Sequence, residues 1–393
     1  MEEINKNNEI KNEEVIKKNG RNTTLNLFEF IAACLIIFIH ILFPEPFGSI
    51  VTGLAKFGVP LFFTVSGFYL IKPNMDKECL RKKLKVRIFR VSKLLIFSFV
   101  IYFILDMITS VFGSTLEGIV EILKSTFSWK SIFFLLVFNI SLVQNVNWFM
   151  IALIYSYIYI YIFADLFLHK DWVKYLLSIL LLFWIAFRMI VTYFNVSLFG
   201  VFLSESYLYL NWFANGLLFI SFGMMLAKYK DKLVNIPYKV LISLLIICII
   251  IQPLEYYILT YKLNYVISYF IGNILCVFTI IALSIKNPNI LNNSKFINQK
   301  GNYTMFIYIF HPAIITIVKF IVNKAGLESN ALMQWTLPII VLIFAVISAM
   351  IFNKILCTIK NSRSSGKVKD KMVEEKLEAE ESKDDIDNLE SNM

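Results

Sequence analysis

Residues Leu25–Leu70 read LNLFEFIAACLIIFIHILFPEPFGSIVTGLAKFGVPLFFTVSGFYL and contain two long apolar runs, 25–43 and 52–71. A short segment with Pro44 and Pro46 joins the two runs. About 20 residues at a rise of 1.5 Å each cross the ~30 Å hydrocarbon core of a bilayer as a helix. The stretch therefore predicts two membrane-spanning helices joined by a tight loop.

Eight further apolar runs of similar length follow this pair along the chain. They lie at 92–112, 147–168, 174–194, 207–227, 238–258, 264–285, 303–322 and 335–357. An eleventh run, 131–143, is shorter than a bilayer-crossing helix and is typical of a re-entrant or interfacial segment. We therefore predict an all-α, polytopic helix bundle with about ten membrane-spanning helices.

The composition of the 393-residue chain agrees with a membrane protein. Hydrophobic residues make up 58% of it and charged residues 17%, and the mean hydropathy is +0.68. A water-soluble domain cannot bury so much apolar surface, whereas lipid can solvate it. The net charge of +10 comes from short Lys and Arg clusters between the apolar runs. Such clusters orient membrane proteins, so we expect a lipid bilayer as a partner and no nucleic acid.

The basic clusters also predict the orientation of the bundle. With ten spans, the Lys- and Arg-rich loops all fall on one side. The opposite loops are nearly free of these residues, and two of them, 44–51 and 195–207, contain none. The positive-inside rule then places both termini in the cytoplasm. We predict a polar cytoplasmic N-terminus (1–24), one membrane domain (25–357) and a charged, disordered cytoplasmic tail (358–393). The five cysteines show no metal-ligand spacing, and we expect neither a disulfide framework nor a metal.

Several polar residues fall at a similar depth within the predicted spans. They are His40, Lys56, Asp106, Asn147 with Trp148, Arg188, Glu255, His311 and Lys319. Of these, Lys56, Glu255 and Lys319 are close enough to the interface to reach it with their charged ends. Ionisable groups in hydrocarbon cost roughly 2.5–3.5 kcal/mol on insertion scales, so each needs a partner or a water-filled cavity. A membrane histidine is often only a helix–helix hydrogen bond, but a histidine also has the chemistry of a general acid or base. Together these residues indicate a polar cavity open to the outside.

The densest basic cluster, Arg81–Lys93, precedes the third predicted span. As a helix it places Arg87 and Arg90 on one face at i, i+3. One interpretation is an anchor that contacts anionic lipid. The other is a phosphate clamp, because two guanidinium groups can bind a diphosphate or a 3′-phosphate.

The motifs, taken in order, resemble the acyltransferase-3 family of membrane acyltransferases. A first helix that ends in a histidine (His40) is followed by VPLFFTVSGFYL, residues 59–70, and by the pair Arg87-Ile-Phe-Arg90. Later come Asn147-Trp148-Phe149, which opens a helix, and Tyr308-Ile-Phe-His311-Pro312. The resemblance covers about 25–357.

The resemblance implies transfer of an acyl group, usually acetyl, from cytoplasmic acyl-CoA (acetyl-CoA) to a hydroxyl of an envelope glycan or a similar small acceptor. It implies that His40 and His311 are catalytic and that Arg87 and Arg90 bind CoA. We expect Asn147, Trp148, Arg188 and Glu29 to line the substrate cavity. The family often has Arg or Lys eleven positions before the first histidine, where this chain has Glu29. This departure allows an unusual donor or acceptor.

Two other functions are open at this stage. One is a transporter of a small polar solute or amino acid, or an exporter of a lipid-linked sugar, although mid-membrane Gly and Pro residues in paired positions are scarce. The other is a membrane sensor or scaffold, for which no specific motif is present. The composition suggests a multi-pass protein of a bacterial plasma membrane. The sequence does not indicate the acceptor or the oligomeric state.

Overall fold

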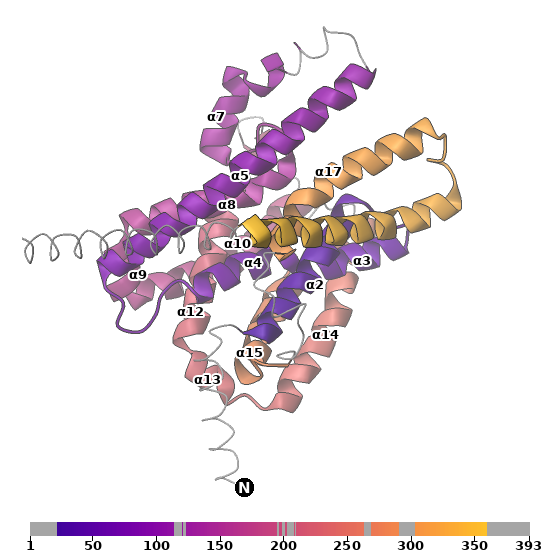
Figure 1. Ribbon diagram of the computed structural model, residues 1–393. Coiled ribbons are helices and arrows are strands. Elements are labelled where there is room, and N and C mark those ends of the chain that lie inside the picture. The colour runs from indigo at the N-terminus through magenta and orange to yellow at the C-terminus, as the bar shows by residue number, and fades with distance from the viewer. Residues whose placement is uncertain are drawn as a thin grey trace, which may run out of the picture.

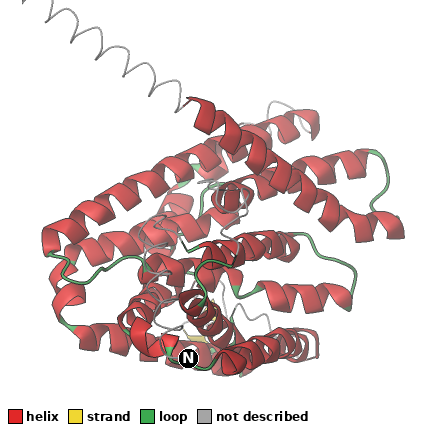
Figure 2. Cartoon of the chain, turned by 60° about the horizontal axis from the view of Figure 1, so that its bottom comes forward, coloured by secondary structure: helices red, strands yellow, loops and turns green. Residues whose placement is uncertain are grey.

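The computed structural model describes residues 22–113, 120, 123–194, 196–198, 201–202, 208, 210–262, 269–290 and 303–359. The described part is almost entirely helical (Figure 2), and β1 (Ser197–Leu198) and β2 (Val201–Phe202) form one short antiparallel pair. The predicted terminal tails lie outside the described residues, except for the two or three residues that begin the first helix and end the last.

Long helices alternate with short helical turns along the chain. In order they are α2 (Thr23–His40), α3 (Phe47–Ala55), α4 (Gly58–Phe68), α5 (Lys77–Gly113), α7 (Trp129–Phe138), the 3-10 turn η1 (Asn145–Asn147), α8 (Trp148–Ile162), α9 (Ala164–His169), α10 (Asp171–Tyr193), the π-helix η2 (Trp212–Leu217), α12 (Leu218–Lys228), α13 (Lys230–Val234), α14 (Tyr238–Tyr256), the π-helix η3 (Tyr257–Lys262), α15 (Ile271–Lys286) and α17 (Tyr303–Lys324). A last helix, Ala331–Ile359, runs antiparallel to α17 (Figure 1).

Eight helical segments of the described chain are long and apolar enough to cross a membrane. They match eight of the predicted spans, with α3 and α4 together forming the second. The predicted spans 207–227 and 264–285 correspond to shorter apolar helices, Trp212–Lys228 and Ile271–Lys286. Helix α7 has 10 residues, too few to cross, as predicted for 131–143. The predicted helical membrane bundle is confirmed.

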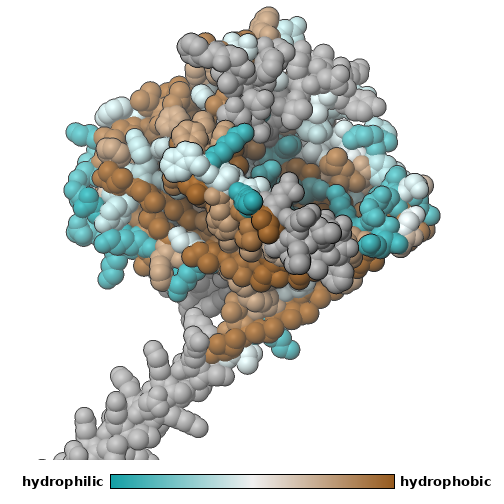
Figure 3. All heavy atoms as spheres, turned by 90° about the horizontal axis from the view of Figure 1, so that it is seen from above, coloured by the Kyte–Doolittle hydropathy of each residue, from teal (hydrophilic) through white to brown (hydrophobic). Residues whose placement is uncertain are grey.

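The centre of the bundle is formed by the segments Phe47–Phe68 and Asn145–Ile162. Of their most apolar windows, 72% and 61% are buried within the protein, against 17% for the helix that begins at Lys77. The less buried helices present apolar side chains outward, and Figure 3 shows broad hydrophobic areas on one face of the described surface. An apolar outer surface of this kind can face lipid. The high burial of α4 and α8 shows that they lie in the interior of the bundle.

Helices α4 and α12 pack backbone to backbone. A Cβ atom built on Gly67 would lie 2.7 Å from the carbonyl carbon of Ile220, and one built on Gly223 would lie 2.8 Å from the backbone nitrogen of Phe68. Small residues allow such close approach, which strengthens dispersion contacts where lipid supplies no hydrophobic driving force. The conformation of the VPLFFTVSGF run therefore depends on α12.

The first helix is fixed at its start by contacts with the end of α15. Asn22 caps α2 by accepting a hydrogen bond from Leu25 N at 2.8 Å, and its side chain donates to Ser284 O at 2.6 Å. Thr23 donates from its backbone and its hydroxyl to Pro288 O. Asparagine at an N-cap satisfies amide groups that the helix itself leaves unbonded. These bonds set the position of α2, which ends at His40.

Candidate active site

Two histidines that are far apart in the sequence lie together in the candidate site. His40 is the last residue of α2 and His311 lies within α17, and their ring centres are 5.2 Å apart with 36° between the ring planes. His311 is fully buried, whereas His40 is exposed. The pair therefore combines one imidazole that a substrate can reach with one that the protein encloses.

The backbone fixes the proton position of the buried histidine. His311 Nδ1 lies 3.1 Å from the carbonyl oxygen of Ile307. Because a carbonyl oxygen only accepts, Nδ1 carries the proton, and in the neutral ring Nε2 keeps its lone pair. Nε2 is buried and has no hydrogen-bond partner among the described residues. A buried acceptor without a partner is costly, so this nitrogen is a candidate contact for substrate.

Tyrosine 308 connects the histidines to the beginning of α8. Its ring centre lies 5.9 Å from that of His311, and its hydroxyl donates to the carbonyl oxygen of Val146. The neighbouring Asn147 is fully buried and accepts a hydrogen bond at its Oδ1 from Ser98 Oγ at 3.0 Å. The Nδ2 of Asn147 has no partner among the described residues. The side-chain amide of Asn147 is therefore an oriented donor. Asn147 directly follows Val146, whose carbonyl oxygen accepts the hydrogen bond from Tyr308.

Trp148 faces another part of the core. Its ring centre is 6.1 Å from that of Phe63 in α4, and its carbonyl accepts from the Asn139 side chain at 3.3 Å. The described contacts therefore link Trp148 to α4 and to the end of α7, rather than to the histidine rings. Its predicted place in the cavity wall stays a prediction.

A lysine beside His40 also interacts with a buried arginine. Lys56, between α3 and α4, interacts electrostatically with both His40 and Arg188. Arg188 is buried and lines a small cavity of about 10 Å³ with Asn215 and Tyr269. A cavity of that size holds about one water molecule. The predicted place of Arg188 and Lys56 in one polar cavity with the histidines stays a prediction.

Comparison with known protein families places the chain in one of them. The acyltransferase domain family matches residues 22–354 of the chain. The chain belongs to this family. The match includes every helix that contributes to the site, and it supports an acyltransferase held in the membrane. No curated protein and no solved structure gives a comparable match.

The two arginines predicted to hold the donor of this acyltransferase have different surroundings. Arg87 donates to the carbonyl oxygens of Ser66 (2.8 Å) and Tyr69 (3.0 Å) at the end of α4. Lys83 donates to Tyr69 O at 2.7 Å as well. Cations at a helix C-terminus satisfy its last carbonyls and complement its dipole. Arg90 is exposed and makes no hydrogen bond or ion pair with the described residues.

Glu29 lies far from the histidines of the acyltransferase. It is half-buried in α2, and eleven residues of helix separate it from His40 by about 16 Å along the axis. The predicted place of Glu29 in the substrate cavity stays a prediction.

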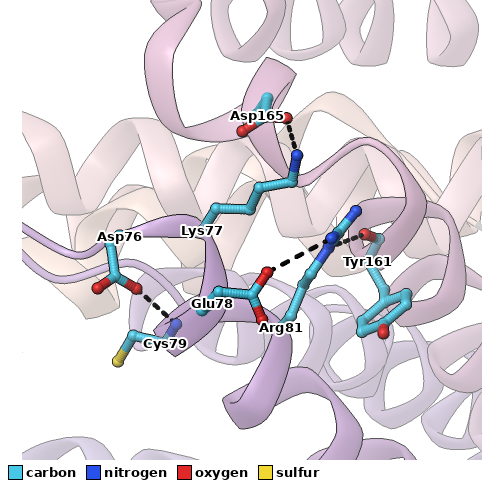
Figure 4. A network of polar contacts seen from close by, with 7 residues as sticks. All are labelled: Asp76, Lys77, Glu78, Cys79, Arg81, Tyr161 and Asp165. Carbon is cyan, nitrogen blue, oxygen red and sulfur yellow. Dashed lines mark hydrogen bonds and ion pairs between the residues drawn. The ribbon is translucent and has the colours of Figure 1, made fainter.

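The basic beginning of α5 is bonded to α8 and α9. Figure 4 shows Asp76 capping α5 through Cys79 N, at 2.6 Å, and Lys77 paired with Asp165. This hydrogen bond from Lys77 lowers the pKa of Asp165 below its ordinary value. Arg81 lies 5.3 Å from the ring centre of Tyr161. Arg81, Lys83 and Arg87 of the basic cluster therefore contact other helices or the ends of helices.

Ser98 and Tyr308 were not among the site residues predicted from the sequence. Tyr308 had a readable signal, since it precedes His311 by three residues and shares its helix face. Ser98 had none, because its hydrogen bond to Asn147 depends on how α5 packs against α8. Metal ligands do not gather here: the described residues contain no cluster of three His, Cys, Asp or Glu side chains.

Proposed function

We propose that this acyltransferase moves an acyl group, usually acetyl, from acyl-CoA to a hydroxyl of a cell-envelope glycan or a similar small acceptor. The observation that carries the proposal is the 5.2 Å approach of His40 and His311. Two imidazoles, one accessible and one with a fixed tautomer, suit proton transfer at neutral pH. The side of the membrane with the basic loops is the cytoplasmic side, from which the donor enters.

His40 acts as the general base in this proposal. It accepts the proton of the acceptor hydroxyl, whose oxygen forms a bond to the thioester carbonyl carbon. The carbon–sulfur bond then breaks, and the protonated His40 returns the proton to the departing thiolate. The products are an ester and the free thiol, so no other reactant is needed.

His311 and Asn147 support this step. Nδ1 of His311 donates to Ile307 O, so the lone pair on Nε2 remains available inside the site. This lone pair gives His40 a polar neighbour. Asn147 Nδ2 is the donor that we assign to the negative charge that develops on the carbonyl oxygen. Loss of one such oriented donor lowers kcat by about 10²–10³-fold in known enzymes.

The test is acyl transfer from radiolabelled acetyl-CoA in membranes that contain the wild-type protein or His40→Ala at equal amounts. We expect His40→Ala to lose about 10²–10⁴-fold of the rate, the usual contribution of a general base. Lys319→Ala is the matched control, because Lys319 is an exposed residue of α17 beyond His311. The labelled fraction, glycan or small molecule, identifies the acceptor. Undiminished transfer by a correctly inserted His40→Ala protein would refute the assignment.

A further inference from the structure

A second cavity lies at the end of the bundle that carries the basic loops. Its volume is about 810 Å³, within the range of ordinary small-molecule sites. The end of α4 and the loop after it form one wall, and α10, α12, α13 and the end of α15 form the others. None of the residues predicted for donor binding lines it.

The cavity has a positive balance of charge. Four lysines and two aspartates line it: Lys72, Lys174, Lys228, Lys230, Asp171 and Asp231. Asp171 pairs with Lys174 at 2.7 Å and also with Lys228. Lys72 and Lys230 form no side-chain hydrogen bond or ion pair with the described residues. These two ammonium groups are available to an anionic ligand.

An aromatic side chain lies beside these cations. Tyr69 lines the cavity, and its side chain is exposed although Tyr69 is large and hydrophobic, with 42% of its surface accessible. Its backbone is held by the hydrogen bonds from Lys83 and Arg87 to its carbonyl oxygen. The phenol ring carried by this backbone is exposed and offers a face on which a planar base stacks. Arg87 thus contributes by positioning Tyr69, not by contacting phosphate.

The first helix connects this cavity to the histidine pair. Asn22, the N-cap of α2, lines the cavity, and His40 is the last residue of the same helix. The 18 residues of α2 span about 27 Å. A ligand bound at one end and reacting at the other must be long and extended. A coenzyme A thioester has this form, with phosphates and a base at one end of a flexible arm and the acyl group at the other.

We propose that this cavity binds the phosphorylated nucleotide end of the acyl donor, with Lys72 and Lys230 as its phosphate-binding cations in place of Arg87 and Arg90. The inference rests on the proposed function for the identity of the donor. The cavity, its charge and its aromatic wall are properties of the described residues themselves.

Binding of adenosine 3′,5′-bisphosphate tests the site without any acyl chemistry. The probe is titrated into the purified full-length protein in nanodiscs of neutral lipid. We expect Lys72→Gln/Lys230→Gln to weaken binding at least tenfold, and added salt to weaken wild-type binding. The control is Lys239→Gln/Lys354→Gln, which removes the same charge from exposed positions outside the cavity. No binding to the wild type, or equal loss in the control, would overturn the proposal.

Three further arms separate the alternatives. If Arg90→Gln lost binding of the probe and Lys72→Gln/Lys230→Gln kept it, the phosphates would be bound by the arginine pair and the proposed site would be refuted. Displacement of the probe by phosphatidylglycerol nanodiscs, with lipid binding lost in the cavity variant, would assign the cavity to a lipid headgroup instead. Lysine-dependent binding without any acyl transfer would refute the proposed function alone, whereas transfer with an unchanged KM for acetyl-CoA in the cavity variant would refute the site alone.

Discussion

The contact between α4 and α12 makes Gly67→Ala a severe perturbation at the centre of the bundle. The added Cβ would lie 2.7 Å from the carbonyl carbon and 2.9 Å from the Cα of Ile220, and closer still to the carbonyl oxygen. All three are backbone atoms, so no side chain can rotate to make room. The helices would have to separate by about 1 Å, a large change where packed axes lie only 8–10 Å apart.

The loss of stability can be taken from the cost of inserting a methyl group where two helices already touch. One methyl group inserted into a packed core costs about 1–3 kcal/mol, and a backbone clash belongs at the upper end of that range. An unfolding entropy of about 2.1 cal/mol/K per residue gives roughly 1–2 °C per kcal/mol for a chain of this length, so we expect the melting temperature to fall by about 3–6 °C. The end of α4 also supports Tyr69, so donor binding should weaken as well.

Thermal stability of the detergent-purified protein measures this effect, and Gly58→Ala is its matched comparison on the same helix. A Cβ on Gly58 would meet the Cγ1 and Cδ1 of Ile36 at 2.9 Å, which are side-chain atoms. We expect Gly58→Ala to destabilise less, and Ile36→Val to relieve its effect. A Gly67→Ala protein as stable as Gly58→Ala would refute the backbone-contact reasoning.

Three other predictions concern residues that position helices. The side chain of Asn139, a residue with φ of 50°, donates to Trp148 O and Leu210 O and accepts from Trp212 N, and Asn139→Ala removes these bonds. We expect a loss of about 1–3 kcal/mol for the first group left unsatisfied, measured as a lower melting temperature, whereas an unchanged value would contradict this role. Arg87→Gln should weaken probe binding by freeing the end of α4, while Arg87→Lys should retain part of it; equal binding by both would contradict the capping role. The pKa of Asp165 is lowered by Lys77, so the ionised carboxylate stabilises the fold at neutral pH and this stabilisation is lost as the carboxylate is protonated in acid. Asp165→Asn should therefore be less stable than wild type near pH 7 and equal to it in acid. A difference that persists in acid would show that the ion pair with Lys77 is not its cause.

The sequence predicted the bundle well because a membrane span is a local property. About 20 apolar residues between polar loops are enough to identify one, without knowledge of its neighbours. The two spans that the structure shortens, Trp212–Lys228 and Ile271–Lys286, adjoin an irregular or undescribed stretch at their beginnings. Their predicted boundaries differ there because hydropathy does not reveal where a helix starts.

The site was predicted only in part, because its contacts depend on packing. Depth along each span predicted that His40, Asn147, Arg188 and His311 belong to one polar region, and the structure places His40 beside His311. The spacing of Arg87 and Arg90 could not reveal that carbonyl groups of α4 occupy the first of them. In the same way, the lysines of the second cavity come from separate loops and helices, so no spacing in the sequence relates them.

The central claim is that His40 and His311 act together in one transfer step. The direct measurement is the rate of acyl transfer from acetyl-CoA by His40→Ala, by His311→Ala and by the double variant, each at matched amounts in membranes. Residues that act as a unit have strongly non-additive effects. We therefore predict that the double variant is no slower than His40→Ala. Losses that multiply in the double variant would show that the two histidines act independently, and the joint role assigned to them would be wrong.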